Sequence, residues 1–225
     1  MSDHAVSFLF DLDGTLVDSV YQHVLAWHEA LQEEGIELSI WRIHRRIGMS
    51  GGLFTNMLFR ETGHAIDDAR IDRIRKRHAA AYKARAHDVR PLPGARELLA
   101  YLSDAGIPWA IATSGRIETA GPIIEMLGVN QEKTPVVTRD KVRYAKPDPD
   151  LFLAAAAALG KPIAHACVIG DSIWDMLAAR RAGALGVGLL SGGYGEDELV
   201  KASAYRVYED PADLLYHIDE VGGRR

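Results

Sequence analysis

Short apolar runs alternate with longer helical patterns over most of the chain. Six apolar runs predict strands, at residues 5–10, 108–112, 135–138, 166–169, 185–189 and 205–208. Apolar positions at helical spacing predict helices between them, at residues 95–103, 117–127, 150–159 and 173–182, with Gly183 as a stop signal. The strands are mostly apolar throughout, as expected when helices cover both faces of a parallel sheet. The predicted fold class is therefore α/β.

Residues 18–90 interrupt this alternation, because they show helical periodicity and no convincing strand. The predicted helices cover residues 23–34, 53–61 and 69–85. The segment ends at the Pro-Leu-Pro-Gly run of residues 91–94, which is typical of a hinge or boundary. We therefore expect a small all-helical domain over residues 18–90, inserted after the first strand of a core domain that comprises residues 1–17 and 91–225.

Composition and charge exclude several classes of protein. With 48% apolar and 25% charged residues, the chain is typical of globular proteins, and its single cysteine, Cys167, cannot form an intramolecular disulfide. The net charge of −5 argues against a general nucleic-acid surface. The longest apolar run covers residues 151–159, whereas a membrane-spanning helix needs ~20 residues. We expect a cytoplasmic protein with no membrane or nucleic-acid partner.

The first candidate site is the run Asp11-Leu12-Asp13-Gly14, which directly follows the first predicted strand. Ligands of parallel sheets bind beyond the carboxyl ends of the strands, so the two carboxylates lie where chemistry is usual. Gly14 allows a sharp turn and a close approach of backbone amides to an anion. A polar strand end followed by a simple turn is the alternative.

A second pair of carboxylates, Asp171 and Asp175, follows another predicted strand. An N-cap explains such residues equally well when they are taken alone. Two pairs at two strand ends are harder to explain that way, because clustered carboxylates raise one another's pKa unless a cation lies among them. Hard oxygen ligands beside a phosphate favour Mg²⁺, so we expect Mg²⁺ as the cofactor.

Two further features follow strands between these pairs. Thr113, Ser114 and Gly115 place a hydroxyl and backbone amides at the start of a helix, which suits a phosphate. Lys146 precedes Pro147, which restricts the lysine backbone to extended conformations and would hold its charge in place. Taken singly, an N-cap and an exposed turn lysine explain both features as well.

The order Asp-x-Asp, Thr, Lys, Asp-x-x-x-Asp, each on its own βα junction, resembles the haloacid dehalogenase-like superfamily. Within it, the chain is similar to the subfamily with a helical cap inserted after the first strand, which includes phosphoglycolate phosphatases and β-phosphoglucomutases. The resemblance implies a Rossmann-like core and a Mg²⁺-dependent phosphatase that forms an aspartyl-phosphate. The substrate would be a small organic phosphate monoester, of the phosphoglycolate or sugar phosphate class.

The resemblance also implies roles for individual residues. Asp11 would be the nucleophile and Asp13 the general acid/base. The phosphoryl group would contact Thr113, Ser114, Gly115 and Lys146. The metal would contact Asp11, the backbone carbonyl of Asp13, Asp171 and, indirectly, Asp175. Because the carboxylates, Mg²⁺ and Lys146 leave a formal charge of −1 that one proton would cancel, we expect a raised pKa for Asp13 in the substrate complex.

The helical insertion would close over the site, exclude water and contact the leaving group. His23 and Trp27 lie four residues apart on its first predicted helix, and either Arg45 or Arg46 could meet an anionic group. The glycine-rich loop around Ser50 and Gly51 is a further candidate, because flexible backbone is otherwise unhelpful between two helices. For His23, a helix-surface position is an equally good explanation.

Three alternatives remain open. A sugar-phosphate mutase of the β-phosphoglucomutase type resembles the chain at Asp18, His23 and Trp27, although mutases carry an arginine where Gly51 stands. A receiver-like phospho-acceptor module also uses strand-end aspartates, a Thr and a Lys, but it needs neither a cap nor Asp13. An inert binding module is the third. The natural substrate and the choice between monomer and homodimer are not determined by the sequence.

Overall fold

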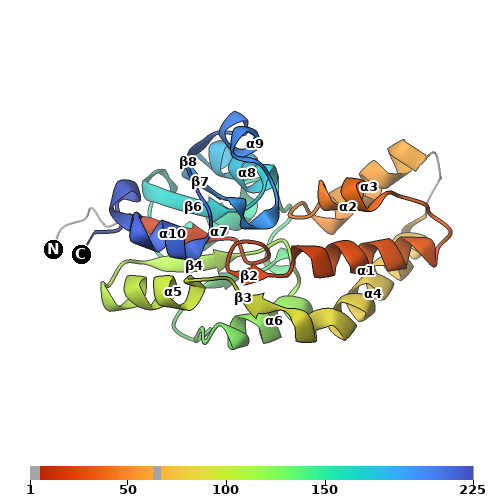
Figure 1. Ribbon diagram of the computed structural model, residues 1–225, viewed down its shortest axis with the longest axis horizontal. Helices are drawn as coiled ribbons and strands as arrows, with labels where there is room; N and C mark the ends of the chain where they lie inside the picture. The colour runs from red at the N-terminus through yellow and green to blue at the C-terminus, as the bar shows by residue number, and fades with distance from the viewer. Residues whose placement is uncertain (1–5, 63–66, 225) are drawn as a thin grey trace.

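The computed structural model describes residues 6–62 and 67–224, and its core is a parallel sheet (Figure 1). In the described part of the chain the sheet has six strands in the order β5-β4-β1-β6-β7-β8, and each neighbouring pair is parallel. The strands are β1 (Ser7–Phe10), β4 (Trp109–Ala112), β5 (Val136–Val137), β6 (Ala166–Gly170), β7 (Leu185–Leu189) and β8 (Ala204–Tyr208).

Helices cover both faces of this sheet because successive strand side chains point to opposite sides and nearly all are apolar. Phe8 and Phe10 of β1 pack with α5 (Ala95–Asp104), α6 (Ile117–Met126) and α10 (Pro211–Tyr216). Leu9, which lies between them, packs on the other face with α7 (Asp150–Ala158) and α8 (Ile173–Ala182). The expected α/β fold with a Rossmann-like sheet is confirmed.

The helical insertion lies at one end of the molecule, beyond the edge of the sheet (Figure 1). It comprises α1 (Val20–Gln32), α2 (Ile40–His44), α3 (Gly51–Thr62) and α4 (Asp68–Arg85). Its own core contains Trp27, Leu31, Phe54 and Ile74, which are buried among residues of all four helices. Because the insertion buries apolar side chains of its own, we refer to α1–α4 and their connections as the cap.

A two-stranded antiparallel ribbon connects the cap to the core. It pairs β2 (Val17–Asp18) with β3 (Arg90–Pro91), so the chain enters and leaves the cap side by side. The sequence analysis predicted no strand there, since two residues are too few to show periodicity. The strand expected at residues 5–10 begins at Ser7, and residue 5 lies outside the described residues.

Three short helices were also not predicted: α2, α9 (Glu196–Lys201) and α10. For α10 a start signal was present, because Asp210 accepts hydrogen bonds from the amides of Ala212 and Asp213, with Pro211 in the first turn. The expected stop at Gly183 is confirmed, since Gly183 ends α8 in the left-handed conformation. Within residues 6–62 and 67–224, no helix is long and apolar enough to cross a membrane.

Candidate active site

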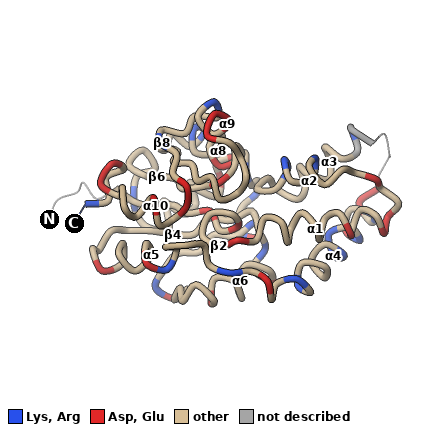
Figure 2. Tube along the Cα trace, viewed as in Figure 1, with Lys and Arg blue, Asp and Glu red and all other residues tan. Residues whose placement is uncertain are grey.

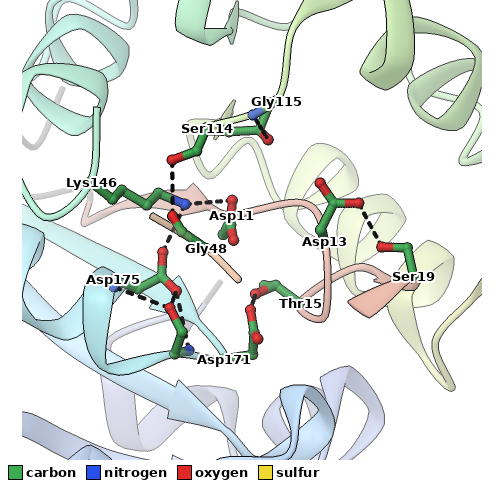
Figure 3. Close-up of polar contacts among 12 residues, drawn as sticks. Asp11, Asp13, Thr15, Ser19, Gly48, Ser114, Gly115, Lys146, Asp171 and Asp175 are labelled. Carbon is green, nitrogen blue, oxygen red and sulfur yellow. Dashed lines mark hydrogen bonds and ion pairs between the residues drawn. The ribbon is translucent and has the colours of Figure 1, made fainter. Parts of the chain in front are cut away.

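The predicted catalytic side chains converge at the carboxyl edge of the sheet (Figure 3). Asp11 follows β1, Thr113 follows β4 and Asp171 follows β6, and these three strands are immediate neighbours. Backbone pairing continues past the end of β1, because the Asp11 amide donates to the Ile169 carbonyl over 2.9 Å. The order of the strands therefore brings the pair Asp11 and Asp13 close to the pair Asp171 and Asp175.

A buried acidic cluster forms the centre of the site. Asp11, Asp171 and Asp175 each offer a carboxylate oxygen, and these oxygens lie within 4.8 Å of one another. The Lys146 ammonium, which is fully buried, forms ion pairs with Asp11 and, over 2.7 Å, with Asp175. The exposed turn lysine that the sequence also allowed is thus excluded. One lysine compensates only part of the charge of three carboxylates.

Two glycines leave room for the Asp171 carboxylate. A Cβ on Gly14 would lie 2.5 Å from Asp171 Oδ2, and one on Gly192 would overlap the same carboxylate. The hydroxyl of Thr15 donates to Asp171 Oδ1 over 3.0 Å, and that of Ser191 donates to the Gly14 carbonyl over 2.6 Å. The loop after β7 therefore packs directly on the acidic cluster, which sequence analysis missed although this loop also follows a strand.

The electrostatics of the cluster favour a divalent cation. Burial raises the pKa of Asp11 to about 7, with Lys146 opposing this effect and Asp175 adding to it. Burial, together with the charges of Asp175 and Asp11, raises the pKa of Asp171 well above its ordinary value. Three oxygen donors with uncompensated negative charge fit a hard cation. The donor set therefore suits a divalent metal.

Asp175 is both a helix cap and a member of the cluster. Its Oδ2 accepts from the Ser172 amide over 3.1 Å, while Ser172 caps α8, so the two residues form a capping box. Its Oδ1 faces Lys146. Asp175 can therefore serve as a capping residue and as a member of the acidic cluster, which are the two explanations that the sequence offered. The capping interaction uses one carboxylate oxygen and leaves the other for the site.

Asp13 points away from this cluster (Figure 3). Its Oδ1 accepts from the Ser19 hydroxyl and lies 3.2 Å from His23 Nε2. Burial raises the pKa of Asp13, but His23, Ser19 and Lys146 outweigh it and hold the pKa below its ordinary value. In the ligand-free protein this lowered pKa favours the charged Asp13 carboxylate, and the raised pKa expected in the substrate complex stays a prediction.

The helix start after β4 is arranged differently from the prediction. The Gly115 amide donates to Thr113 Oγ1 over 2.9 Å, so a phosphoryl group would compete for that amide. The Ser114 hydroxyl donates to the Gly48 carbonyl over 3.0 Å and thereby ties the core to the cap. Thr113 is buried and lines the cavity described next.

A cavity of about 200 Å³ lies between core and cap, with Asp11, Asp13 and Thr113 at its core end. Four of the predicted cap residues line it: His23, Trp27, Arg46 and Gly51.

Two predicted cap residues do not line the cavity. The Ser50 amide donates to the Lys146 carbonyl over 3.0 Å, and its hydroxyl accepts from the Leu53 amide. Of the two arginines offered as alternatives for an anionic group, Arg46 lines the cavity, whereas Arg45 forms an ion pair with Glu198 and lies over the Tyr194 ring, 4.1 Å from its centroid. Arg45 therefore contacts the core, because α2 turns that face toward α9.

Sequence reasoning missed an aromatic stack beside Asp13. The His23 ring stacks on Tyr82 with centroids 3.9 Å apart, and His78 stacks on Trp27 at 4.1 Å. His23 Nδ1 also lies 3.2 Å from His78 Nε2. His78 and Tyr82 lie four residues apart on α4, a spacing that marks one helix face but not which face meets α1.

Fold and site together define a hydrolase-type α/β enzyme with a capped acidic centre. The family model of the haloacid dehalogenase-like hydrolases matches residues 7–183. The chain therefore belongs to the haloacid dehalogenase-like hydrolase family, as the motifs of the sequence implied.

Individual relatives agree with this assignment. The chain is 31% identical over 216 residues to phosphoglycolate phosphatase of Caulobacter vibrioides, covering 95% of this chain and 87% of that one. It is 33% identical over 178 residues to hexitol phosphatase A of Escherichia coli, covering 78% and 79%. A crystal structure of a hydrolase from Pseudomonas syringae superposes with a TM-score of 0.93 at 59% identity, covering 96% and 98%.

Proposed function

We propose that this enzyme is a Mg²⁺-dependent phosphatase that hydrolyses a small organic phosphate monoester through an aspartyl-phosphate on Asp11. One observation carries the proposal. Asp11 and Asp13 both lie at the core end of the cavity, but Asp11 is paired with Lys146, whereas the Asp13 carboxylate contacts Ser19 and His23. This divides nucleophile from acid/base, as phosphoryl transfer requires.

In the first step an Asp11 oxygen attacks phosphorus and the bond from phosphorus to the leaving oxygen breaks. Asp13, once protonated in the substrate complex, donates its proton to that oxygen. In the second step water attacks the phosphorus of the aspartyl-phosphate and gives a proton to the Asp13 carboxylate. The bond between phosphorus and Asp11 breaks, which releases inorganic phosphate and restores both carboxyl groups.

Asp11, Asp171 and Asp175 would hold the metal, Asp175 through an intermediary, and the Asp13 carbonyl remains a proposed ligand. When bound, Mg²⁺ supplies positive charge that offsets the carboxylates and the phosphoryl oxygens. Lys146 adds a fixed charge, since ion pairs to Asp11 and Asp175 hold its ammonium in place. Thr113 would donate its hydroxyl to a phosphoryl oxygen.

The cap, for which we propose residues 18–90, would exclude water and select the leaving group. The contacts that hold it on the core include Ser114 with Gly48, the Ser50 amide with the Lys146 carbonyl, and Trp174 Nε1 with the Arg45 carbonyl over 3.3 Å. Gly51 lines the cavity without a side chain, where mutases of similar sequence carry an arginine. This favours hydrolysis over the mutase reaction.

The test is phosphate release from p-nitrophenyl phosphate and from a panel of phosphorylated metabolites, with Mg²⁺ or with EDTA. Asp11→Asn serves as the blank. We expect release that requires both the metal and Asp11. A second arm supplies β-glucose 1-phosphate with a bisphosphate activator, and isomerisation faster than phosphate release would establish the mutase instead. No turnover in either arm would leave a non-enzymatic role.

A further inference from the structure

The cavity wall holds four arginines, namely Arg46 and three others that lie near one another. Arg75 comes from α4 of the cap, Arg116 directly precedes α6, and Arg139 lies in the short turn of Arg139–Lys141 after β5. Figure 2 shows the basic positions along α4. We call these three residues the arginine arc. Glu118 is the only acidic residue of the cavity wall, among the described residues, besides Asp11 and Asp13.

The Arg75 guanidinium is close enough to those of Arg116 and Arg139 to be repelled by both, and Asp72 offsets part of this repulsion. Burial lowers the pKa of Arg75, and the charges of Arg116 and Arg139 lower it further. Gly52 leaves room for the Arg75 side chain, since a Cβ there would lie 3.3 Å from Arg75 Nη2. The protein thus keeps like charges together in a partly buried place, which is stabilised when an anion lies between them.

Each arginine of the arc keeps donors for a ligand. Arg116 pairs with Asp140 over 2.8 Å, Arg139 donates to the Val142 carbonyl over 2.7 Å, and Arg75 lies 3.7 Å from Asp72. A guanidinium has five N–H donors in a fixed fork, so one partner orients the group and leaves several donors.

The arc lies where the leaving group would extend. A Cβ on Gly115 would be 3.2 Å from Thr113 Oγ1 and 3.9 Å from Asp13 Oδ2. Gly115 therefore adjoins both a proposed phosphoryl contact and the proposed acid, and Arg116 is the next residue. Beyond Asp13, a leaving group of a few atoms would reach the arc.

We propose that the arginine arc selects phosphate monoesters whose leaving group carries a second anionic group. This rests on the proposed phosphatase function and narrows its substrate class. The charge of the second group would pair with guanidinium donors of the arc, and charge-assisted hydrogen bonds of this kind discriminate strongly against neutral analogues. A carboxylate and a second phosphate share this chemistry.

The experiment compares two pairs of substrates with the Mg²⁺-loaded enzyme. Phosphoglycolate is compared with 2-hydroxyethyl phosphate, and glucose 1,6-bisphosphate with glucose 6-phosphate, so the two pairs separate a carboxylate from a phosphate. We expect kcat/KM to favour the member with the second anionic group by about 10-fold or more in at least one pair. Arg75→Gln should reduce that ratio to about 2-fold through KM, and Arg75→Lys should restore part of it.

Arg73→Gln is the matched control, because Arg73 lies on the same helix but pairs with Glu34 outside the cavity. The ratio should be unchanged in that variant. Equal kcat/KM within both pairs, or a ratio that survives Arg75→Gln combined with Arg116→Gln, would overturn the proposal.

Binding of the same compounds to Asp11→Asn, measured by calorimetry, separates the two proposals. A binding preference for the doubly anionic member without phosphate release by the wild type would overturn the phosphatase and keep the arc. Phosphate release from both members of each pair, with equal binding, would overturn the proposal for the arginine arc and keep the phosphatase.

Discussion

The positions of the side chains have different structural causes in the core half and in the cap half of the cavity. In the core half, Asp11, Asp171 and Asp175 stand at the ends of adjacent parallel strands or one turn beyond, and their positions follow from the sheet. In the cap half, His23 and Arg75 come from helices whose rotation is set by packing between them. The core half fixes the chemistry, whereas the choice of substrate would depend on the cap half together with Arg116 and Arg139 of the core.

The two halves also differ in how their charge is held. The acidic cluster is fully buried and only partly neutralised by Lys146, so each member depends strongly on its neighbours. Arg45 of the cap, by contrast, pairs with Glu198 at a partly exposed position. Substitutions in the core half should therefore abolish activity or stability, and those in the cap half should shift specificity or have little effect.

The largest effect is expected for Asp11→Asn. An amide cannot act as the nucleophile, so steady-state phosphate release should fall by about 10³-fold or more. Asp148→Asn is the matched control, because Asp148 lies outside the cavity and pairs with Arg181 at 3.7 Å. Activity above a tenth of the wild type in Asp11→Asn would contradict the nucleophile assignment.

Asp13→Asn should separate the two steps. Loss of a general acid/base costs about 10²–10⁴ in rate, but p-nitrophenolate leaves without protonation. We therefore expect a burst of p-nitrophenolate equal to the enzyme concentration, followed by slow turnover because hydrolysis of the aspartyl-phosphate lacks its base. For an alkyl phosphate, no burst should occur. Stopped-flow absorbance measures the first case, and quenched phosphate release the second.

The sequence predicted the core half because its signals are local and the topology is regular. Asp11 and Asp171 follow apolar runs, and parallel strands bring their carboxyl ends to one edge. It left Arg45 and Arg46 as alternatives, of which only Arg46 lines the cavity, and it missed Arg75 and Tyr82, because the rotation of short or polar helices depends on tertiary packing. The strands at Val17–Asp18 and Arg90–Pro91 were not predicted for another reason. A strand of two residues is too short to show an alternation of apolar and polar positions.

Lys146→Met tests how far the acidic cluster depends on its one buried cation. Removing it leaves Asp11 and Asp175 without their ion pairs, which should lower the free energy of unfolding by about 3–5 kcal/mol in the metal-free protein. Chemical denaturation with EDTA measures the loss, and Lys133→Met, an exposed lysine, is the control. A loss below about 1 kcal/mol would show that the carboxylates take up protons at little cost.

The raised pKa of Asp11, about 7 compared with 3.8, makes metal binding depend on pH. Without metal, the folded state holds more protons than the unfolded chain between these values, so this group's contribution to stability is lost as pH rises through 7. A metal needs the deprotonated carboxylate, so its affinity should rise over the same range. We expect the apparent Kd for Mg²⁺ to weaken by about 10-fold per pH unit below 7 for each proton displaced. Calorimetry between pH 5.5 and 8 measures this, and a flat profile would contradict it.

The smallest effect is expected for Arg45→Ala, which tests the boundary between the two halves. Its ion pair with Glu198 is partly exposed, and such pairs contribute ~0.2–1 kcal/mol, so the melting temperature should fall by only a few degrees. Because Arg45 faces the core and not the cavity, KM should change by less than about 2-fold, in contrast to Arg75→Gln. Thermal unfolding and steady-state kinetics on one acidic substrate measure both. A KM that rises as much as in Arg75→Gln would mean that Arg45 turns into the cavity when substrate binds, and the cap half would then be set by the ligand more than by helix packing.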